Sequence, residues 1–367
     1  MRRKKPKQIE YYMHHEIFQQ IEVLSSLFEE HVDYEKRQIR FSEKSMIGKL
    51  KKIKRYVFLG LGSSAHAAMM GNYYFEEIAM INAEFEFADE FVSRRAILEP
   101  HTAVVVLSQS GKSKDAISAA KIAKDKGAVL ISVSNTQGSA LDRLADLRFN
   151  TNAGEEKGVA ATKSFSSQLM ILFLLSLYIL QMKNEKLVLR RKWIDELRKT
   201  PEYLKEVLGL ENEIKKIAKA IYKKDALMVL GRKFNFPIAL EGAHKIKETA
   251  YFHAEGVASE EFRHGHEAML DKDFPVFVLS SDIDFYKDDL KLFGELQKAK
   301  APLFVLSDYN KAVVKNKSKA FVKFKKTNEI TESFQFLVLL QLLAFHLAIL
   351  KEIDVNNPRN ISKYVDH

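Results

Sequence analysis

The sequence predicts an α/β protein with two tandem, doubly wound domains, each a parallel sheet flanked by helices. Short apolar runs that end in small residues alternate with longer segments of helical periodicity. The same order of runs occurs twice, which indicates two copies of one domain. The matching leucines, 171 to 173 positions apart, are Leu59 with Leu230, Leu107 with Leu279, and Leu130 with Leu303. With 367 residues, 46% of them hydrophobic, the chain can form two such cores.

Residues 1–48 are expected to form a tail and one helix, because apolar residues recur there at helical spacing. These residues are Ile17, Ile21, Leu24 and Phe28. The first domain is expected over residues 49–183. Its apolar runs and helical segments lie, in order, at 55–64 (strand), 68–81 (helix), 102–113 (strand), 115–127 (helix), 128–136 (strand), 141–151 (short helix and edge strand) and 162–182 (helix).

A charged segment at residues 184–224 is expected to be a helical linker to a second domain at residues 225–352. The matching runs there lie at 226–234, 275–282 and 301–310 (strands) and at 334–350 (helix). Residues 353–367 are expected to form a C-terminal tail. The two apolar runs at 169–182 and 334–350 hold 14 and 17 residues, short of a clean membrane span, so we expect buried helices.

The composition excludes several classes of function. The chain has no cysteine, which excludes disulfides, thiolate metal sites and a thiol nucleophile. Its basic start is not followed by the apolar core of a signal peptide, so we expect a cytoplasmic protein without membrane association. The net charge of +10 comes without a recognition-helix signature or zinc-ligand spacing. We therefore expect no nucleic-acid partner, and a basic surface that suits anionic small molecules.

Two loops of small polar residues, each after a predicted strand of the first domain, are expected to bind a phosphate. The candidates are Gly60, Gly62, Ser63 and Ser64 in the first loop and Ser108, Gln109, Ser110, Gly111 and Ser113 in the second. Each loop precedes a helix, whose N-terminus presents free N–H groups and the positive end of the helix dipole. Both loops follow the carboxyl ends of parallel strands, where open α/β sheets bind ligands. The second half has Gly231-Arg232 and Ser280-Ser281-Asp282 at these places.

A dinucleotide site is an alternative interpretation of the first loop. Gly60, Gly62 and Ala65 fit the pattern G-x-G-x-x-A, and Glu84 and Glu86 follow at about the distance of a ribose-binding acid. The second serine-rich loop favours a monophosphate. Plain tight turns without a ligand are a third possibility.

The second half carries the candidate acid–base groups. Glu241, Lys245 and Glu248 are spaced by four and three residues and so share one face of a helix that can begin near Pro237. His264 follows in a charged stretch flanked by glycine. A carboxylate, an amine and an imidazole suit proton transfer on a small polar substrate. The same Glu–Lys spacing is also an ordinary surface salt-bridge pattern.

Several motifs, in order along the chain, resemble the isomerase (SIS) domains of glutamine–fructose-6-phosphate aminotransferase, also called glucosamine-6-phosphate synthase. These motifs are LSQSGKS, TNAGEEKGVAATKSF, PIALEGAHKIKE, HAEGVASEEFRHG and DVNNPRNISK. The N-terminal YYMHHEIFQQ is similar to the segment that follows the glutaminase domain of that family. The resemblance runs from about residue 10 to the C-terminus and implies two SIS domains.

The resemblance implies a role for each matching residue. The implied substrate ligands are Ser64, Ser108, Gln109, Ser110 and Ser113 at the phosphate, and Glu156 and Val159 in a loop that lines the sugar. Glu241 is a further candidate for substrate binding. Lys363 would form a Schiff base with the open-chain ketose. Glu248 would carry a proton between C1 and C2, and Lys245 would assist at a sugar hydroxyl. His264 would open the sugar ring from the neighbouring subunit of a homodimer. No cofactor and no metal are implied.

The sequence departs from the family pattern at three positions. Lys112 stands where an acid is usual, Ala161 where serine is usual, and His266 where proline is usual. These changes put the identity of the sugar in doubt.

The absence of cysteine excludes the cysteine-dependent glutaminase reaction of the full family. The first interpretation is therefore the sugar half of a split enzyme that makes glucosamine 6-phosphate from fructose 6-phosphate and ammonia, with a separate glutaminase subunit. The alternatives are a stand-alone glucosamine-6-phosphate deaminase or related deglycase, and a sugar-phosphate sensor without turnover. Retention of the four implied catalytic residues argues against a sensor.

Overall fold

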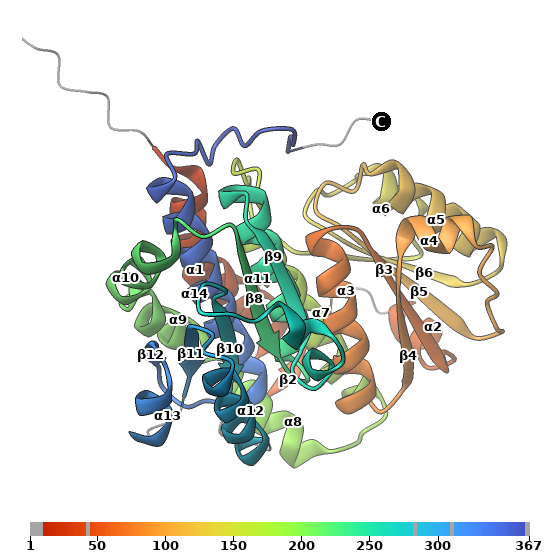
Figure 1. Ribbon diagram of the computed structural model, residues 1–367. Coiled ribbons are helices and arrows are strands. Elements are labelled where there is room, and N and C mark those ends of the chain that lie inside the picture. The colour runs from red at the N-terminus through yellow and green to blue at the C-terminus, as the bar shows by residue number, and fades with distance from the viewer. Residues whose placement is uncertain (1–9, 42–44, 282–284, 309–311, 364–367) are drawn as a thin grey trace, which may run out of the picture.

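The computed structural model describes residues 10–41, 45–281, 285–308 and 312–363 (Figure 1). Within these ranges the chain forms two five-stranded parallel sheets and a small antiparallel pair, β1 (Val32–Asp33) with β2 (Gln38–Ile39). The two parallel sheets with flanking helices confirm the predicted fold. The basic N-terminal tail and Asp282 lie outside the described residues.

The first sheet has the strand order β4-β3-β5-β6-β7. Its strands are β3 (Arg55–Gly60), β4 (Asn82–Phe87), β5 (Thr102–Ser108), β6 (Val129–Ser134) and β7 (Leu147–Asn150). The helices of this half are α2 (Ser45–Leu50), α3 (Ser63–Glu77), α4 (Ala88–Ser93), α5 (Lys114–Asp125), α6 (Ala140–Leu144) and α7 (Lys163–Met182). The sequence did not predict β4, a half-exposed edge strand with little apolar signal.

The second sheet repeats this order as β9-β8-β10-β11-β12. Its strands are β8 (Ala226–Gly231), β9 (His253–Ala258), β10 (Val276–Ser280), β11 (Leu303–Ser307) and β12 (Ala320–Lys323). Its helices are α11 (Asn235–Ala250), α12 (Tyr286–Lys298), α13 (Ala312–Lys317) and α14 (Glu329–Leu350), with short 3-10 turns at Glu261–Arg263 and His266–Met269. In each sheet the second strand along the chain (β4 or β9) lies at the edge, beside the first (β3 or β8). This shared order confirms the internal repeat.

The central strands are apolar throughout because both faces of each sheet are covered. Tyr56 and Phe58 of β3 join one large core, which runs from sheet to sheet through α1 (Tyr12–His31), α3, α7, α11 and α14. Val57 and Leu59 of the same strand face the opposite way, into a smaller core under α4, α5 and α6. A third core lies under α12 and α13. Helices α3 and α11 therefore meet at the centre of the molecule.

Helices α7 and α14 are longer than their apolar runs, with 20 and 22 residues. Polar residues at their N-terminal ends are also helical, so the expectation that both are too short to span a membrane was wrong. By length and composition both could cross a membrane, but 89% of the apolar window of each is buried within the protein. The burial of α7 and α14 confirms the prediction that both are buried helices.

The segment expected as a linker consists of three helices, α8 (Leu187–Leu197), α9 (Thr200–Leu208) and α10 (Glu211–Ile221). Helix α9 packs on α1 and α14, and α10 packs on α14. The chain after α14 returns to the start of α1, where Asn356 Nδ2 donates to the Glu10 carbonyl and Asn356 Oδ1 accepts from the Tyr12 N–H. This return carries the C-terminal tail across one end of the molecule (Figure 1).

Candidate active site

The first small-residue loop is a tight turn between β3 and α3. A Cβ on Gly60 would lie 2.3 Å from the Ser64 carbonyl oxygen, so this position requires glycine. Gly62 has a φ of +53° and immediately precedes α3. The Ser64 hydroxyl accepts a 3.1 Å hydrogen bond from Gln168 on α7, which fixes it in the first turn of α3.

The second loop connects β5 to α5 and is held by its own side chains. The Ser108 hydroxyl accepts from the Gly111 N–H at 3.1 Å, and the Ser110 hydroxyl accepts from the Lys112 N–H at 3.2 Å. Ser113 stands at the position that begins α5. Both loops thus lie at the carboxyl edge of adjacent strands, each at the N-terminus of a helix, as a phosphate site requires.

The strand order disfavours the dinucleotide alternative. In the first sheet the second strand along the chain, β4, lies at the edge, as in flavodoxin-like sheets. In dinucleotide-binding folds the third strand occupies that edge. The two candidate ribose acids are also engaged in ion pairs, Glu84 with Arg55 and Glu86 with Arg94. The geometry therefore favours a monophosphate.

An open cleft of about 730 Å³ lies beside the second loop. Gln109, Asn135, Asn152, Glu156 and Lys363 are among its lining residues. Its volume is that of a small-molecule site, and its amide and charged lining suits a polar ligand.

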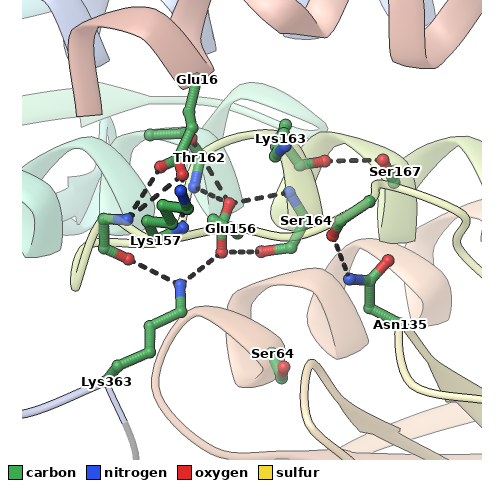
Figure 2. Close-up of polar contacts among 12 residues, drawn as sticks. Glu16, Ser64, Asn135, Glu156, Lys157, Thr162, Lys163, Ser164, Ser167 and Lys363 are labelled. Atoms are coloured by element: carbon green, nitrogen blue, oxygen red, sulfur yellow. Dashed lines mark hydrogen bonds and ion pairs between the residues drawn. The ribbon is translucent and has the colours of Figure 1, made fainter. Parts of the chain in front are cut away.

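The C-terminal tail brings Lys363 into this cleft (Figure 2). Its Nζ donates to Glu156 Oε2 and to the Gly158 carbonyl, both at 2.7 Å. Glu156 is fully buried and also accepts from the N–H groups of Thr162 and Ser164 and from the Ser164 hydroxyl. Burial raises the pKa of Glu156, but the charge of Lys363 and these hydrogen bonds more than offset it, so the pKa lies below its ordinary value.

Glu16 of α1 supports the same loop from the other side (Figure 2). Its carboxylate accepts from the N–H groups of Lys157 and Gly158. Burial and the neighbouring Glu156 raise the pKa of Glu16 above its ordinary value. Val159, expected near the sugar, follows directly and is half-buried.

Glu241, Lys245 and Glu248 lie on one face of α11, as their spacing predicts, and Glu241 and Lys245 are buried there. The side chains of Glu241 and Lys245 are 0% and 1% exposed. Lys245 Nζ contacts Glu248 Oε2 closely and lies 3.5 Å from Glu241 Oε1. The alternative of an ordinary surface salt bridge was therefore wrong.

Two histidines complete this ionic cluster. His66 of α3 places Nδ1 2.7 Å from Glu241 Oε2, and His244 of α11 places Nε2 3.0 Å from Glu248 Oε1. The cluster joins the two halves of the chain, since α3 belongs to the first and α11 to the second.

The two carboxylates and the amine of the cluster stabilise one another's charged forms. Burial raises the pKa of Glu248, but Lys245 and His244 outweigh it and lower the pKa to about 2. Glu241 behaves similarly, its pKa lowered by Lys245 and His66 against the effect of burial. Burial lowers the pKa of Lys245, but Glu241 and Glu248, with a smaller contribution from Glu156, raise it above its ordinary value. Glu156, which holds Lys363, is thus within electrostatic range of Lys245.

His264 is not part of this assembly within one chain. It is exposed and ends the short turn Glu261–Arg263. His266 lies 3.6 Å from Glu255 of the same region. Lys112 is exposed within the second loop, and Ala161 is half-buried two residues after Val159.

Sequence reasoning missed His66, His244 and Glu16. His244 precedes Glu248 by four residues, so helical spacing alone could have indicated the pair. His66 and Glu16 meet partners 175 and 142 residues away, and no local pattern indicates such contacts.

Comparison with known proteins identifies the family. The model of the SIS domain matches residues 49–178 and 220–351. The glutamine–fructose-6-phosphate aminotransferase (isomerizing) of Chlorobaculum tepidum is 33% identical over 362 residues, covering 97% of this chain and 58% of the relative. The human glutamine–fructose-6-phosphate aminotransferase (isomerizing) 2 is 33% identical over 356 residues, covering 96% of this chain and 52% of the relative. The chain thus spans a little over half the length of these relatives.

Among solved structures, the C-terminal domain of glucosamine-fructose-6-phosphate aminotransferase from Francisella tularensis superposes with a TM-score of 0.90 at 29% identity. The match covers 96% of this chain and 99% of that one. The matched residues, the duplicated sheets and the paired small-residue loops together show that the chain belongs to the SIS domain family.

Proposed function

We propose that the chain is a sugar-phosphate isomerase and aminotransferase that converts fructose 6-phosphate and ammonia to glucosamine 6-phosphate. The observation that carries this proposal is the position of Lys363, a C-terminal amine held in a polar cleft beside the second small-residue loop and paired with Glu156, which also acts on Lys245 of the buried cluster. The names of its relatives support the same reaction.

In this proposal the first domain binds the phosphate and the second supplies the acid–base groups. Residues 49–183 form the first domain, whose loops hold the phosphate through Ser64, Ser108, Gln109, Ser110 and Ser113. Residues 225–352 supply the acid–base groups, and residues 353–367 carry Lys363. Glu156, Val159 and Glu241 lie around the sugar.

The chemistry then proceeds in balanced steps. Lys363 gives one proton to Glu156 and attacks C2 of the open-chain ketose as a neutral amine, and water departs with the two remaining amine protons as the Schiff base forms. Ammonia displaces Lys363 at C2 to give the free imine. Glu248 removes a proton from C1 and returns it to C2, while Lys245 moves the proton of the C1 hydroxyl to the imine nitrogen, which leaves an aldehyde at C1 and an amine at C2.

The quaternary part of the proposal is a cytoplasmic homodimer. His264 would reach the site of the neighbouring subunit and open the sugar ring, which accounts for its exposure in a single chain. Ammonia would come from solution or from a separate glutaminase subunit.

The test is turnover followed by phosphorus NMR. The purified chain is incubated with fructose 6-phosphate and ammonium, and in a second sample with glucosamine 6-phosphate. Formation of glucosamine 6-phosphate supports the proposal, and rapid release without net synthesis supports a deaminase instead. A shifted phosphorus signal without conversion in either sample would contradict both and favour a sensor.

A further inference from the structure

We propose that His244 is a positioning residue for Glu248, which aims the carboxylate at the substrate carbons. This inference deepens the proposed function and rests on it. It concerns the one member of the ionic cluster that contacts the base and also lies beside the phosphate loop.

The first observation is that the Glu248 carboxylate is held at both oxygens. Lys245 contacts Oε2, and His244 Nε2 lies 3.0 Å from Oε1. A carboxylate held at one oxygen can rotate about its last bond, whereas one held at two is fixed in its plane. The neutral imidazole can make the second contact as a donor only with its proton on Nε2.

The second observation is the location of the ring. A Cβ on Gly62 would lie 3.8 Å from His244 Nε2, so this nitrogen lies against the turn that begins α3. The ring also meets His66 edge to face, with 5.5 Å between centroids. The imidazole therefore stands between the loop that carries Ser64 and the carboxylate that would move the proton.

The third observation is that different residues keep Glu248 charged and fix its orientation. Glu241 and Lys245 are inaccessible, whereas Glu248 and His244 are 22% and 29% exposed and form the accessible side of the cluster. Lys245 is the largest influence that keeps Glu248 ionised. Loss of His244 would therefore leave a charged carboxylate in place but free to rotate.

A proton shift between adjacent carbons needs one oxygen that reaches both, so orientation of the carboxylate affects the rate directly. We expect His244→Leu to lower kcat about tenfold, or about 1.4 kcal/mol in the barrier. The KM for fructose 6-phosphate should change less than about twofold, because the serine ligands are untouched.

The experiment compares His244→Leu with His244→Gln, whose amide can donate to the same oxygen. The matched control is His346→Leu, since His346 Nε2 also lies 3.0 Å from a carboxylate, that of Glu211, away from the cluster. Deuterium uptake by fructose 6-phosphate in D2O that contains ammonium, followed by NMR, measures the proton transfer itself. His244→Leu should be slow, His244→Gln should recover most of the rate, and His346→Leu should match wild type.

Wild-type exchange in His244→Leu, or equal losses in His244→Leu and His244→Gln, would overturn the inference. If the wild-type chain exchanges no proton at all, the proposed function has failed instead. The contact is then tested by NMR of histidine labelled with nitrogen-15. The ring nitrogen signals of His244 should move in Glu248→Gln, and unchanged signals would overturn the inference without reference to activity.

Discussion

Substitution of Lys245 by methionine tests the ionic cluster most severely. Methionine has nearly the same length but no charge, so the buried Glu241 and the partly buried Glu248 lose the cation between them. Removal of one partner from a buried ion pair costs about 3–5 kcal/mol, because the remaining charge stays out of water. We expect the free energy of unfolding of Lys245→Met to fall by that amount at pH 7.

The loss of stability in Lys245→Met is expected to depend on pH. In the wild type the pKa of Glu248 lies below its unfolded value, so its contribution to stability is complete above about pH 4.5 and lost as the pH falls towards about 2. Without Lys245, we expect burial to outweigh the remaining histidine contacts and to raise the pKa of both carboxylates in the folded state. The folded variant then binds more protons than the unfolded chain, so its stability decreases as the pH rises above about 4.5.

The assay is urea unfolding between pH 5 and pH 8, followed by fluorescence of the single tryptophan, Trp193, which packs on Phe173. The deficit of Lys245→Met relative to wild type should grow with pH. Lys247→Met on the exposed face of α11 is the matched control and should change stability by less than about 0.5 kcal/mol. Glu248→Gln, added to Lys245→Met, should restore part of the lost stability because it removes one of the two carboxylates left without their cation. A deficit below about 1 kcal/mol, or one that shrinks with pH, would refute the reasoning.

Three further predictions follow from the site. Glu248→Gln should abolish turnover and deuterium exchange while fructose 6-phosphate binding by calorimetry stays within about twofold; equal losses of both would contradict the role of base. Lys363→Met should abolish glucosamine 6-phosphate synthesis by phosphorus NMR and retain binding, and full synthesis would exclude a Schiff base. Gly111→Ala should cost about 2 kcal/mol in urea unfolding and weaken phosphate binding, because Gly111 has a φ of +60° and its Cβ would lie 2.1 Å from the Ser139 hydroxyl. Unchanged stability would show that the loop adapts.

The fold was predictable from the sequence where the apolar signal is strong. Strands β3, β5 and β6 are buried on both faces and form unbroken apolar runs, and their repeat at an offset of 171 to 173 residues indicates the duplication. Edge strands β4 and β9 escaped prediction because solvent covers part of each and polar residues interrupt them. The last helix was predicted to begin at residue 334 but begins at Glu329, because its first turn is polar and hydropathy does not indicate it.

The candidate site was predictable only in part, for a related reason. The face of Glu241, Lys245 and Glu248 follows from spacing on one helix, and the serine-rich loops follow from their place after strands. His66, by contrast, reaches Glu241 only because α3 and α11 pack together, and Glu16 reaches the Lys363 loop only because α1 does. Such contacts depend on the relative placement of whole elements, which local patterns do not encode.

The most direct test of the proposed reaction is to trap the Schiff base on Lys363. The chain is mixed with fructose 6-phosphate, reduced with borohydride, digested and analysed by mass spectrometry, with Lys363→Met treated in parallel. We predict one reduced hexose-phosphate adduct, on the peptide that contains Lys363, which disappears in the variant. An adduct spread over surface lysines, or the same adduct in Lys363→Met, would contradict the assignment of Lys363 as the carbonyl-binding amine.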